Sequence, residues 1–122
     1  MRQGVPLKDI LAVVLQPNTE QNVMLLAVPF FHGTGCVSVL VRGMQDGQKV
    51  VLMRRWNVKD AVKLMVEHKV NTIGGVPAIT AAIIQSGLLP KDHKIRVAGY
   101  GGAAPSERLV GDVKKQWPDC LP

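Results

Sequence analysis

The sequence predicts an α/β fold, with a mostly parallel sheet of about four strands and flanking helices. Two kinds of segment alternate after residue 23: short β-branched or apolar runs, and longer stretches with apolar residues at helical spacing. The short runs are apolar almost throughout, which is typical of parallel strands covered on both faces. These runs are residues 23–28, 49–53, 70–73 and 95–98.

Three segments that follow the later strands carry recognisable helix ends. The first helix begins after Asn57, a good N-cap residue, and its apolar residues then recur on one face. The second starts near Pro77, a residue favoured in a first helical turn, and stops at Gly87. The third starts near Pro105 and closes before Pro118.

Two further segments are predicted as helices on weaker patterns. Residues 34–44 are apolar on nearly all sides and suit either a buried helix or a strand. We favour a helix, because the first strand needs a crossover to reach a parallel neighbour. Residues 6–15 also show helical spacing. The sequence contains no repeat, low-complexity tract or linker, so residues 1–122 are predicted to form a single α/β unit.

Composition narrows the class of protein. Hydrophobic residues make up 47% and charged residues 20%, as in ordinary globular chains, and no apolar run is long enough to cross a bilayer. The N-terminus does not resemble a secretory signal, so we expect an intracellular, cytoplasmic protein. The net charge of +6 suggests an anionic partner. Nucleic acid is not expected, because the cations are scattered and aromatic residues make up only 4%.

The cysteine and histidine pattern predicts no metal site. Cys36 and Cys120 are the only cysteines, and both are expected to be reduced thiols. His32 and Cys36 are close in sequence, but a metal needs about four ligands and no second pair stands at ligand spacing.

Four loops follow the predicted strands, and ligands bind open parallel sheets outside the carboxyl ends of the strands. The loops are residues 29–33, 54–56, 74–77 and 99–105. If the strands are adjacent and parallel, His32, Val76 and Gly101 lie along one edge and can line one pocket. Trp56 is predicted to be a helix staple or a core anchor rather than a stacking residue.

Two alternatives to a catalytic pocket stay open at this point. The pattern Gly99-x-Gly101-x-x-Ala104 after a strand, with Asp119 about 20 residues later, fits a dinucleotide fingerprint. Asp119 should then end a second strand, yet Pro118 precedes it directly. A stand-alone nucleotide- or dinucleotide-binding module is therefore one alternative. The other is a structural fold unit without a ligand, which self-associates through uncovered faces.

Taken in order, the motifs resemble those of AMP-binding acyl-CoA synthetases, the adenylate-forming superfamily that includes fatty acid and 4-coumarate CoA ligases. Pro29-Phe30-Phe31-His32 is similar to the family's motif of proline, two hydrophobic or aromatic residues and histidine. Gly75-Val76-Pro77 is similar to its Val-Pro loop at the acyl pocket. Tyr100-Gly101-Gly102-Ala103 resembles its Gly-Gly-Ala turn, which borders the adenine and the acyl group. The likeness runs from about residue 23 to residue 118.

The resemblance implies an ATP-dependent acid–thiol ligase that forms an acyl adenylate and then a CoA thioester. It implies ATP, AMP, CoA and Mg²⁺ as the enzyme's cofactors and substrates, together with a small carboxylate, as in fatty acid metabolism. The residues that it assigns to the acyl pocket are His32, Gly33, Val76 and Pro77. Those that it assigns to the nucleotide are Gly101, Gly102, Ala103 and Ala104. One departure is that Ala104 separates the Gly-Gly-Ala turn from Pro105, whereas proline usually follows this turn directly.

Several motifs of the resembled family have no counterpart in the 122 residues. These are the Ser/Thr/Gly-rich phosphate loop, the Tyr-Gly-x-Thr-Glu segment that helps to hold magnesium, the ribose-binding aspartate and the catalytic lysine. We therefore expect an internal fragment of the large N-terminal domain of such an enzyme, whose parent is cytoplasmic or peroxisomal. No catalytic residue and no metal ligand is assigned to this chain, and the isolated chain is expected to be inactive.

Overall fold

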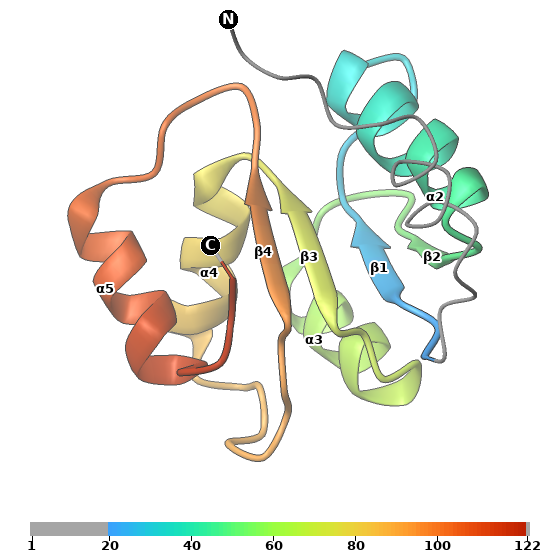
Figure 1. The fold of residues 1–122 in the computed structure, drawn as a ribbon. Coiled ribbons are helices and arrows are strands. Elements are labelled where there is room, and N and C mark those ends of the chain that lie inside the picture. Colours follow the sequence, from blue (N-terminus) through green and yellow to red (C-terminus); the bar gives the residue numbers. More distant parts are fainter. Residues whose placement is uncertain (1–19, 122) are drawn as a thin grey trace, which may run out of the picture.

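A computed structural model describes residues 20–121, so the helix predicted over residues 6–15 lies outside the described part. The described residues form a four-stranded sheet with the strand order β2-β1-β3-β4, and every neighbouring pair is parallel (Figure 1). The strands are β1 (Val23–Leu26), β2 (Lys49–Leu52), β3 (Thr72–Gly75) and β4 (Val97–Tyr100). This arrangement confirms the predicted fold class.

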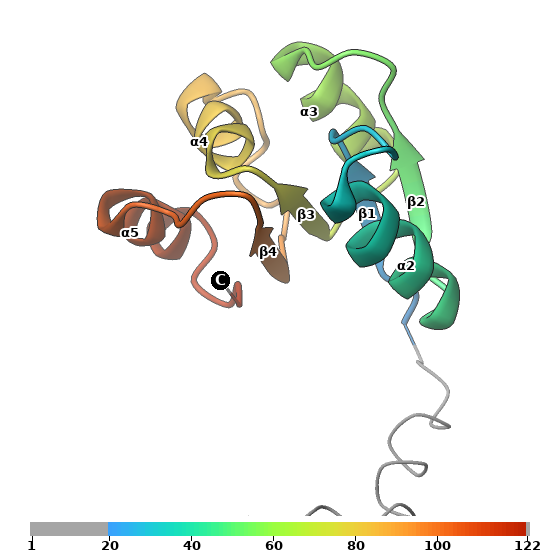
Figure 2. The ribbon, with the colours of Figure 1, turned by 90° about the horizontal axis from the view of Figure 1, so that it is seen from above.

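Helices connect the strands and cover the sheet. They are η1 (Thr34–Val41), which continues directly into α2 (Arg42–Gln45), then α3 (Val58–Glu67), α4 (Pro77–Ser86) and α5 (Glu107–Gln116). Figure 2 shows α3 and α4 over one face of the sheet, and η1 with α2 over the other face, next to β1 and β2. No helix of the described residues covers β3 and β4 on that second face.

The predicted helix ends are largely confirmed. The Asn57 side chain accepts hydrogen bonds from the backbone N–H groups of Lys59 (2.9 Å) and Asp60 (3.2 Å), which caps α3. Gly87 ends α4 with a left-handed φ of 62°. The helix α5 starts slightly later than predicted, because Ser106 accepts from the Leu109 N–H and provides the N-cap.

The strand positions need a correction. We predicted strands over residues 70–73 and 95–98, but β3 and β4 each begin two residues later, while β1 and β2 end earlier than predicted. Val70 and Ile95 are buried core residues that precede the paired segments. Gly74, Gly75 and Gly99 therefore belong to the sheet rather than to loops, since backbone pairing does not require a side chain.

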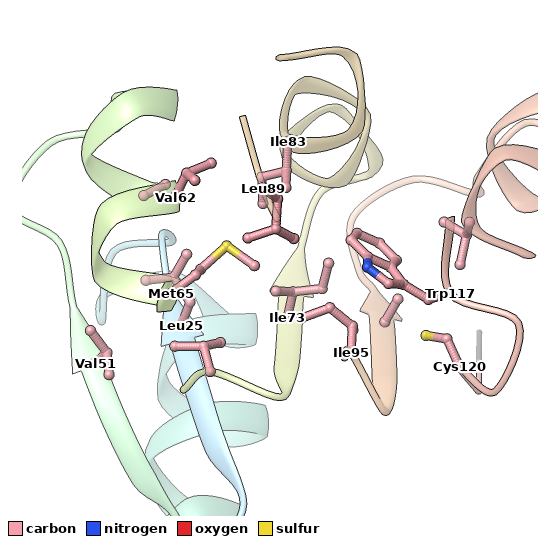
Figure 3. Close-up of a cluster of buried hydrophobic side chains, with 14 of the residues drawn as sticks. Leu25, Val51, Val62, Met65, Ile73, Ile83, Leu89, Ile95, Trp117 and Cys120 are labelled. Carbon is pink, nitrogen blue, oxygen red and sulfur yellow. The ribbon is translucent and has the colours of Figure 1, made fainter. Parts of the chain in front are cut away.

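The main core lies between the sheet and α3, α4 and α5 (Figure 3). Leu25 and Ile73 project from the central strands toward Met65 of α3 and Ile83 of α4, and all four side chains are at most 2% exposed. Trp117, directly after α5, closes the end of the core next to β4. The apolar runs of the sequence are thus explained mainly by one continuous core.

The segment predicted as a buried helix is helical but mostly exposed. Val37 is 63% exposed and Met44 is 76% exposed on the η1–α2 helix, whereas Val39 is buried. The N–H of Arg42 bonds to the Val37 carbonyl five residues earlier, which is the wider π-helical pattern. Gly35 lies so close to the Pro29 carbonyl that a Cβ atom there would overlap it.

The chain returns to the sheet after α5. The Leu121 N–H donates to the Arg96 carbonyl and the Ala98 N–H donates to the Leu121 carbonyl, both at 2.9 Å. Leu121 thereby pairs in parallel with Val97 at the outer side of β4. The chain therefore returns, after α5, to the start of the strand from which this segment began.

Candidate functional site

The loops that follow the four strands lie along one edge of the sheet, because all neighbouring strands are parallel (Figure 1). The loop after β1 is next to the loop after β3, which in turn is next to the loop after β4. The sequence-based prediction that these loops share an edge is therefore confirmed by the sheet order.

A backbone hydrogen bond joins the loops after β3 and β4. The Gly101 N–H donates to the Gly75 carbonyl at 2.9 Å. Gly75 has a φ of 138°, and a Cβ there would stand 3.0 Å from Ile79 Cδ1 and 3.1 Å from Val28 Cγ2. Only glycine fits this position without strain, so the sequence Gly74-Gly75 reflects close packing at the strand end.

Val76 and Gly102, the residues that follow the two bonded glycines, lie close to each other. Gly102 has a φ of 79°, and a Cβ built on it would lie 3.6 Å from Val76 Cγ1. Val76 is 40% exposed, while Gly102, Ala103 and Ala104 are also exposed. The structure therefore presents an apolar side chain next to nearly bare backbone, a surface suited to a flat ligand.

His32 and Gly33 lie on the neighbouring loop after β1. The His32 N–H donates to the Pro29 carbonyl, and its own carbonyl accepts from the Cys36 N–H, both at 3.0 Å. These two bonds turn the chain from the strand into η1. The His32 residue is exposed, and a Cβ at Gly33 would meet no atom within 4 Å.

Pro77 and Ala104 line a groove to which neither Val76 nor Gly102 contributes. This groove has a volume of about 340 Å³ and lies between α4 and α5. Ala81 and Ile84 of α4 and Leu109 of α5 form its apolar part, and sequence reasoning did not identify them. The sequence signal that could have found this groove is the set of short side chains at positions 77, 78 and 81, which helical spacing places on one side of α4.

The loop after β2 borders two further cavities. An open cavity of about 530 Å³ is lined by Arg54, Arg55 and Asp60, and another of about 400 Å³ contains Arg54 and Phe30. Trp56 was predicted as a staple or core anchor, but it is 39% exposed and so is not a core anchor. It directly precedes Asn57, the N-cap residue of α3.

Tyr100 is a polar residue that the sequence did not single out by its side chain. Its hydroxyl is buried and has no hydrogen-bond partner among the described residues. Burial raises the pKa of the Tyr100 phenol, and the nearby Cys120 adds to this increase. The phenol is therefore neutral at physiological pH. Both cysteines are free, Cys36 exposed and Cys120 buried.

Asp119 lies at the wrong edge of the sheet for the dinucleotide alternative. It precedes Leu121, which pairs with Val97 at the start of β4. The turn from Gly101 to Ala104 follows the other end of that strand. A ribose-binding acid must stand at the carboxyl edge beside the glycine turn, so this geometry does not support the fingerprint.

Two statements about metals and membranes hold for the described residues. No group of three or more His, Cys, Asp or Glu side chains is placed to hold a metal ion in residues 20–121. This stretch therefore offers no ligand cluster for Mg²⁺. Within the same stretch, no helix has the length and apolar character needed to span a membrane.

The sequence matches one protein-family model and several CoA ligases. The model of a family described as AMP-binding enzyme matches residues 6–121. A 2-succinylbenzoate–CoA ligase from Bacillus subtilis (strain 168) is 32% identical over 101 residues, 82% of this chain and 20% of that protein. A 4-coumarate–CoA ligase from Narcissus pseudonarcissus is 26% identical over 104 residues, 84% of this chain and 19% of that protein. The chain thus spans about a fifth of the length of these curated relatives.

Solved structures agree with the sequence comparison. The o-succinylbenzoate coenzyme A synthetase from Bacillus subtilis, in complex with AMP, matches with a TM-score of 0.69 and 27% identity. That match covers 90% of this chain and 28% of the synthetase chain. The inhibitor-bound N-terminal domain of FACL13 from Mycobacterium tuberculosis matches with a TM-score of 0.68 and 26% identity, over 79% of this chain and 24% of that one. The chain therefore belongs to the AMP-binding enzyme family, the adenylate-forming enzymes that include acyl-CoA ligases.

Proposed function

We propose that this chain forms the acyl-pocket and adenine-side walls of an ATP-dependent acyl-CoA synthetase. In that reaction a carboxylate oxygen attacks the α-phosphorus of ATP, which gives an acyl adenylate and releases pyrophosphate. The CoA thiol then attacks the acyl carbon and releases AMP with formation of the thioester. The observation that supports the proposal best is the bond from the Gly101 N–H to the Gly75 carbonyl, which joins two of the walls.

The proposed nucleotide wall is the turn from Gly101 to Ala104. Its residues are small, and Gly102 carries no side chain at a positive φ. An adenine ring can approach the backbone of such a turn closely, with Val76 providing apolar contact beside it. The relative from Bacillus subtilis has been solved with AMP, which supports a nucleotide for this family.

The proposed acyl wall consists of His32, Gly33, Val76 and Pro77. Val76 offers apolar surface at the end of β3, and His32 stands on the loop after the neighbouring strand β1. An acyl pocket needs such apolar walls with few polar groups. The open space around Gly33 leaves room for the substrate entrance on this side.

The same proposal assigns ATP, CoA and Mg²⁺ to the whole reaction rather than to these residues alone. The chain has no counterpart of the phosphate loop or catalytic lysine that the resemblance implies, and such groups stabilise the charge that develops at phosphorus. We therefore propose that the isolated chain is inactive. We also propose that the protein is intracellular and that the chain self-associates through the exposed apolar side chains of η1 and α2.

Nuclear magnetic resonance on the ¹⁵N-labelled 122-residue chain tests the walls even when binding is weak. AMP and a non-hydrolysable acyl-adenylate analogue should shift the amide signals of Val76 and of residues 101–104. Gly102→Val should abolish these shifts, whereas Gly111→Ala, a change within α5 with no atom within 4 Å of the new Cβ, should preserve them.

Three results would count against the proposal. Amide signal shifts centred on other residues would show that the nucleotide binds elsewhere. Micromolar affinity for a nucleotide would favour a stand-alone binding module. An unchanged spectrum at millimolar ligand would favour a structural unit without a ligand. Pyrophosphate release from ATP, Mg²⁺ and a fatty acid by the purified chain would contradict the proposed inactivity.

A further inference from the structure

A small cavity lies at the amino edge of the sheet, opposite the edge that carries the proposed walls. Its volume is about 210 Å³, which is room for about seven water molecules, and it lies between the loop that precedes β4 and the segment that follows α5. Both segments meet at the start of β4, where Leu121 pairs with Val97. The turn from Gly101 to Ala104 follows the other end of that strand, about 10 Å further along it. A molecule in this cavity therefore does not occupy the proposed nucleotide wall.

Hydrogen bonds fix both sides of this cavity. The His93 Nε2–H donates to the Val70 carbonyl at 2.7 Å, which ties the loop before β4 to the chain before β3. On the other side, the Trp117 backbone N–H donates to the Val113 carbonyl at 2.8 Å, and the Trp117 carbonyl accepts from the Cys120 N–H at 3.0 Å. Because these segments are already held in place, a ligand that binds between them loses little affinity to ordering of the chain.

Part of the cavity wall is apolar and contains a buried donor. Ile95 and Trp117 line the cavity and are only 2% and 4% exposed, at the end of the core next to β4 (Figure 3). The Nε1–H group of Trp117 is buried, and no residue in the described part of the chain accepts a hydrogen bond from it. A buried donor without an acceptor is unfavourable, so the indole gains by turning toward an oxygen atom bound in the cavity.

Cations outnumber acids in the charged part of the wall. Lys91, Lys94 and Arg96 line the cavity, together with the two acids Asp92 and Asp119. Arg96 is engaged by a glutamate at 3.0 Å, whereas neither lysine forms an ion pair within residues 20–121. An ammonium group of this kind forms a charge-assisted bond with a carboxylate or phosphate oxygen. Because two acids share the wall, a singly charged carboxylate fits better than a doubly charged phosphate.

We propose that this cavity binds a small carboxylic acid with an apolar body, at a site separate from the proposed acyl wall. The carboxylate pairs with Lys91 and Lys94, and the Trp117 indole turns its N–H toward one of the carboxylate oxygens. The apolar body lies against Ile95 and Pro118, which line the same cavity. The acid clamps the start of β4 to the chain after α5, so it acts as a stabilising effector rather than as a substrate. The site does not rest on the proposed function, because no residue of the proposed walls lines this cavity.

The test uses the ¹⁵N-labelled chain with Trp56→Phe, in which Trp117 is the only indole left of the two in the sequence. The probes are 4-methylpentanoate, its neutral amide, acetate and leucine, each titrated at the same ionic strength. We expect 4-methylpentanoate to move the indole N–H signal and to raise the melting temperature. The amide lacks the charge and acetate lacks the apolar body, so both should bind at least tenfold more weakly.

Three results of these titrations would overturn the site. An amide that binds as tightly as the acid would show that the lysines are not used. An indole signal that 4-methylpentanoate leaves unchanged would show that the cavity is empty of acid. Tighter binding of leucine than of 4-methylpentanoate would show that the ligand is a zwitterion, whose ammonium group pairs with Asp92 or Asp119, and not a simple acid.

Charge-matched variants separate a site from general attraction to a chain of net charge +6. Lys91→Ala/Lys94→Ala should weaken binding of 4-methylpentanoate at least fivefold. Lys59→Ala/Lys63→Ala removes the same charge from exposed positions on α3, outside the cavity, and should change the affinity less than twofold. Equal losses in the two variants would show that only the net charge of the chain attracts the acid.

The two acids of the wall provide a change of the opposite sign. Asp92→Asn/Asp119→Asn removes two like charges from the surroundings of the carboxylate and should strengthen its binding at least twofold. Weaker binding of 4-methylpentanoate to this variant would contradict the placement of its carboxylate in the cavity.

The same spectra distinguish this site from the proposed walls. If 4-methylpentanoate shifts the amide signals of Val76 and residues 101–104 and leaves the Trp117 indole unchanged, the cavity site is wrong and the walls stand. If it shifts the Trp117 indole while the acyl-adenylate analogue leaves Val76 and residues 101–104 unchanged, the walls are wrong and the cavity site stands.

Discussion

Replacing Gly75 with alanine should destabilise the protein strongly, because two separate costs act at this position. The residue has a φ of 138°, which side-chain-bearing residues rarely adopt, and such backbone strain costs about 1–3 kcal/mol. The new methyl would also stand 3.0 Å from Ile79 Cδ1 and 3.1 Å from Val28 Cγ2. Overpacking of this kind costs about 1–3 kcal/mol more. We therefore expect Gly75→Ala to lower the free energy of unfolding by roughly 2–6 kcal/mol.

Urea denaturation followed by circular dichroism measures this loss, with Gly111→Ala as the matched control. Gly111 lies within α5, and a Cβ there would meet no atom within 4 Å. Alanine should therefore stabilise the helix by about 0.5–1 kcal/mol. The two glycine replacements should have opposite signs. A Gly75→Ala variant whose free energy of unfolding stays within about 0.5 kcal/mol of wild type would refute the close packing described at this strand end.

Two further predictions concern the helix cap and the buried thiol. Asn57→Ala should cost about 1 kcal/mol in thermal or urea unfolding because Lys59 and Asp60 lose their side-chain acceptor, while Asn57→Asp should retain most of the stability; equal losses in both variants would contradict the cap. Cys36 should react with a thiol reagent in the folded protein and Cys120 only after unfolding, since Cys120 is buried and burial raises its pKa. That increase contributes stability below the ordinary thiol pKa, and the contribution should be lost as the pH rises through the alkaline range toward the folded pKa, a decline that Cys120→Ala should reduce.

The fold was predictable because the apolar runs and helix-end residues of the sequence coincide with the strands and helices of the structure. The apolar runs placed four strands, and the end signals at Asn57 and Gly87 placed two helices close to their observed limits. The exact strand limits were not predictable from apolar character, because Val70 and Ile95 fill the core before pairing begins. The pairing of β3 with β4 continues instead through Gly74, Gly75 and Gly99, and glycines add nothing to the apolar pattern by which strands are predicted.

The candidate site was predictable at the level of loops rather than of contacts. Parallel strands placed all four loops at one edge, and Val76 does meet Gly102 there. The bond from Gly101 to Gly75 involves only backbone atoms, so no residue type indicates it. The exposure of η1 also escaped prediction, because an apolar helix has the same sequence pattern whether or not another surface covers it.

The wholly parallel sheet has a consequence for how the chain folds. No two neighbouring strands are joined by a hairpin, so Val23 must find Lys49, Met24 must find Thr72, and Thr72 must find Val97 across long intervening segments. Each pairing closes a large loop before its contacts compensate for the lost chain entropy. Refolding should therefore be slow for a chain of this size, with the two central strands β1 and β3 as the organising centre because each must pair with a strand on either side.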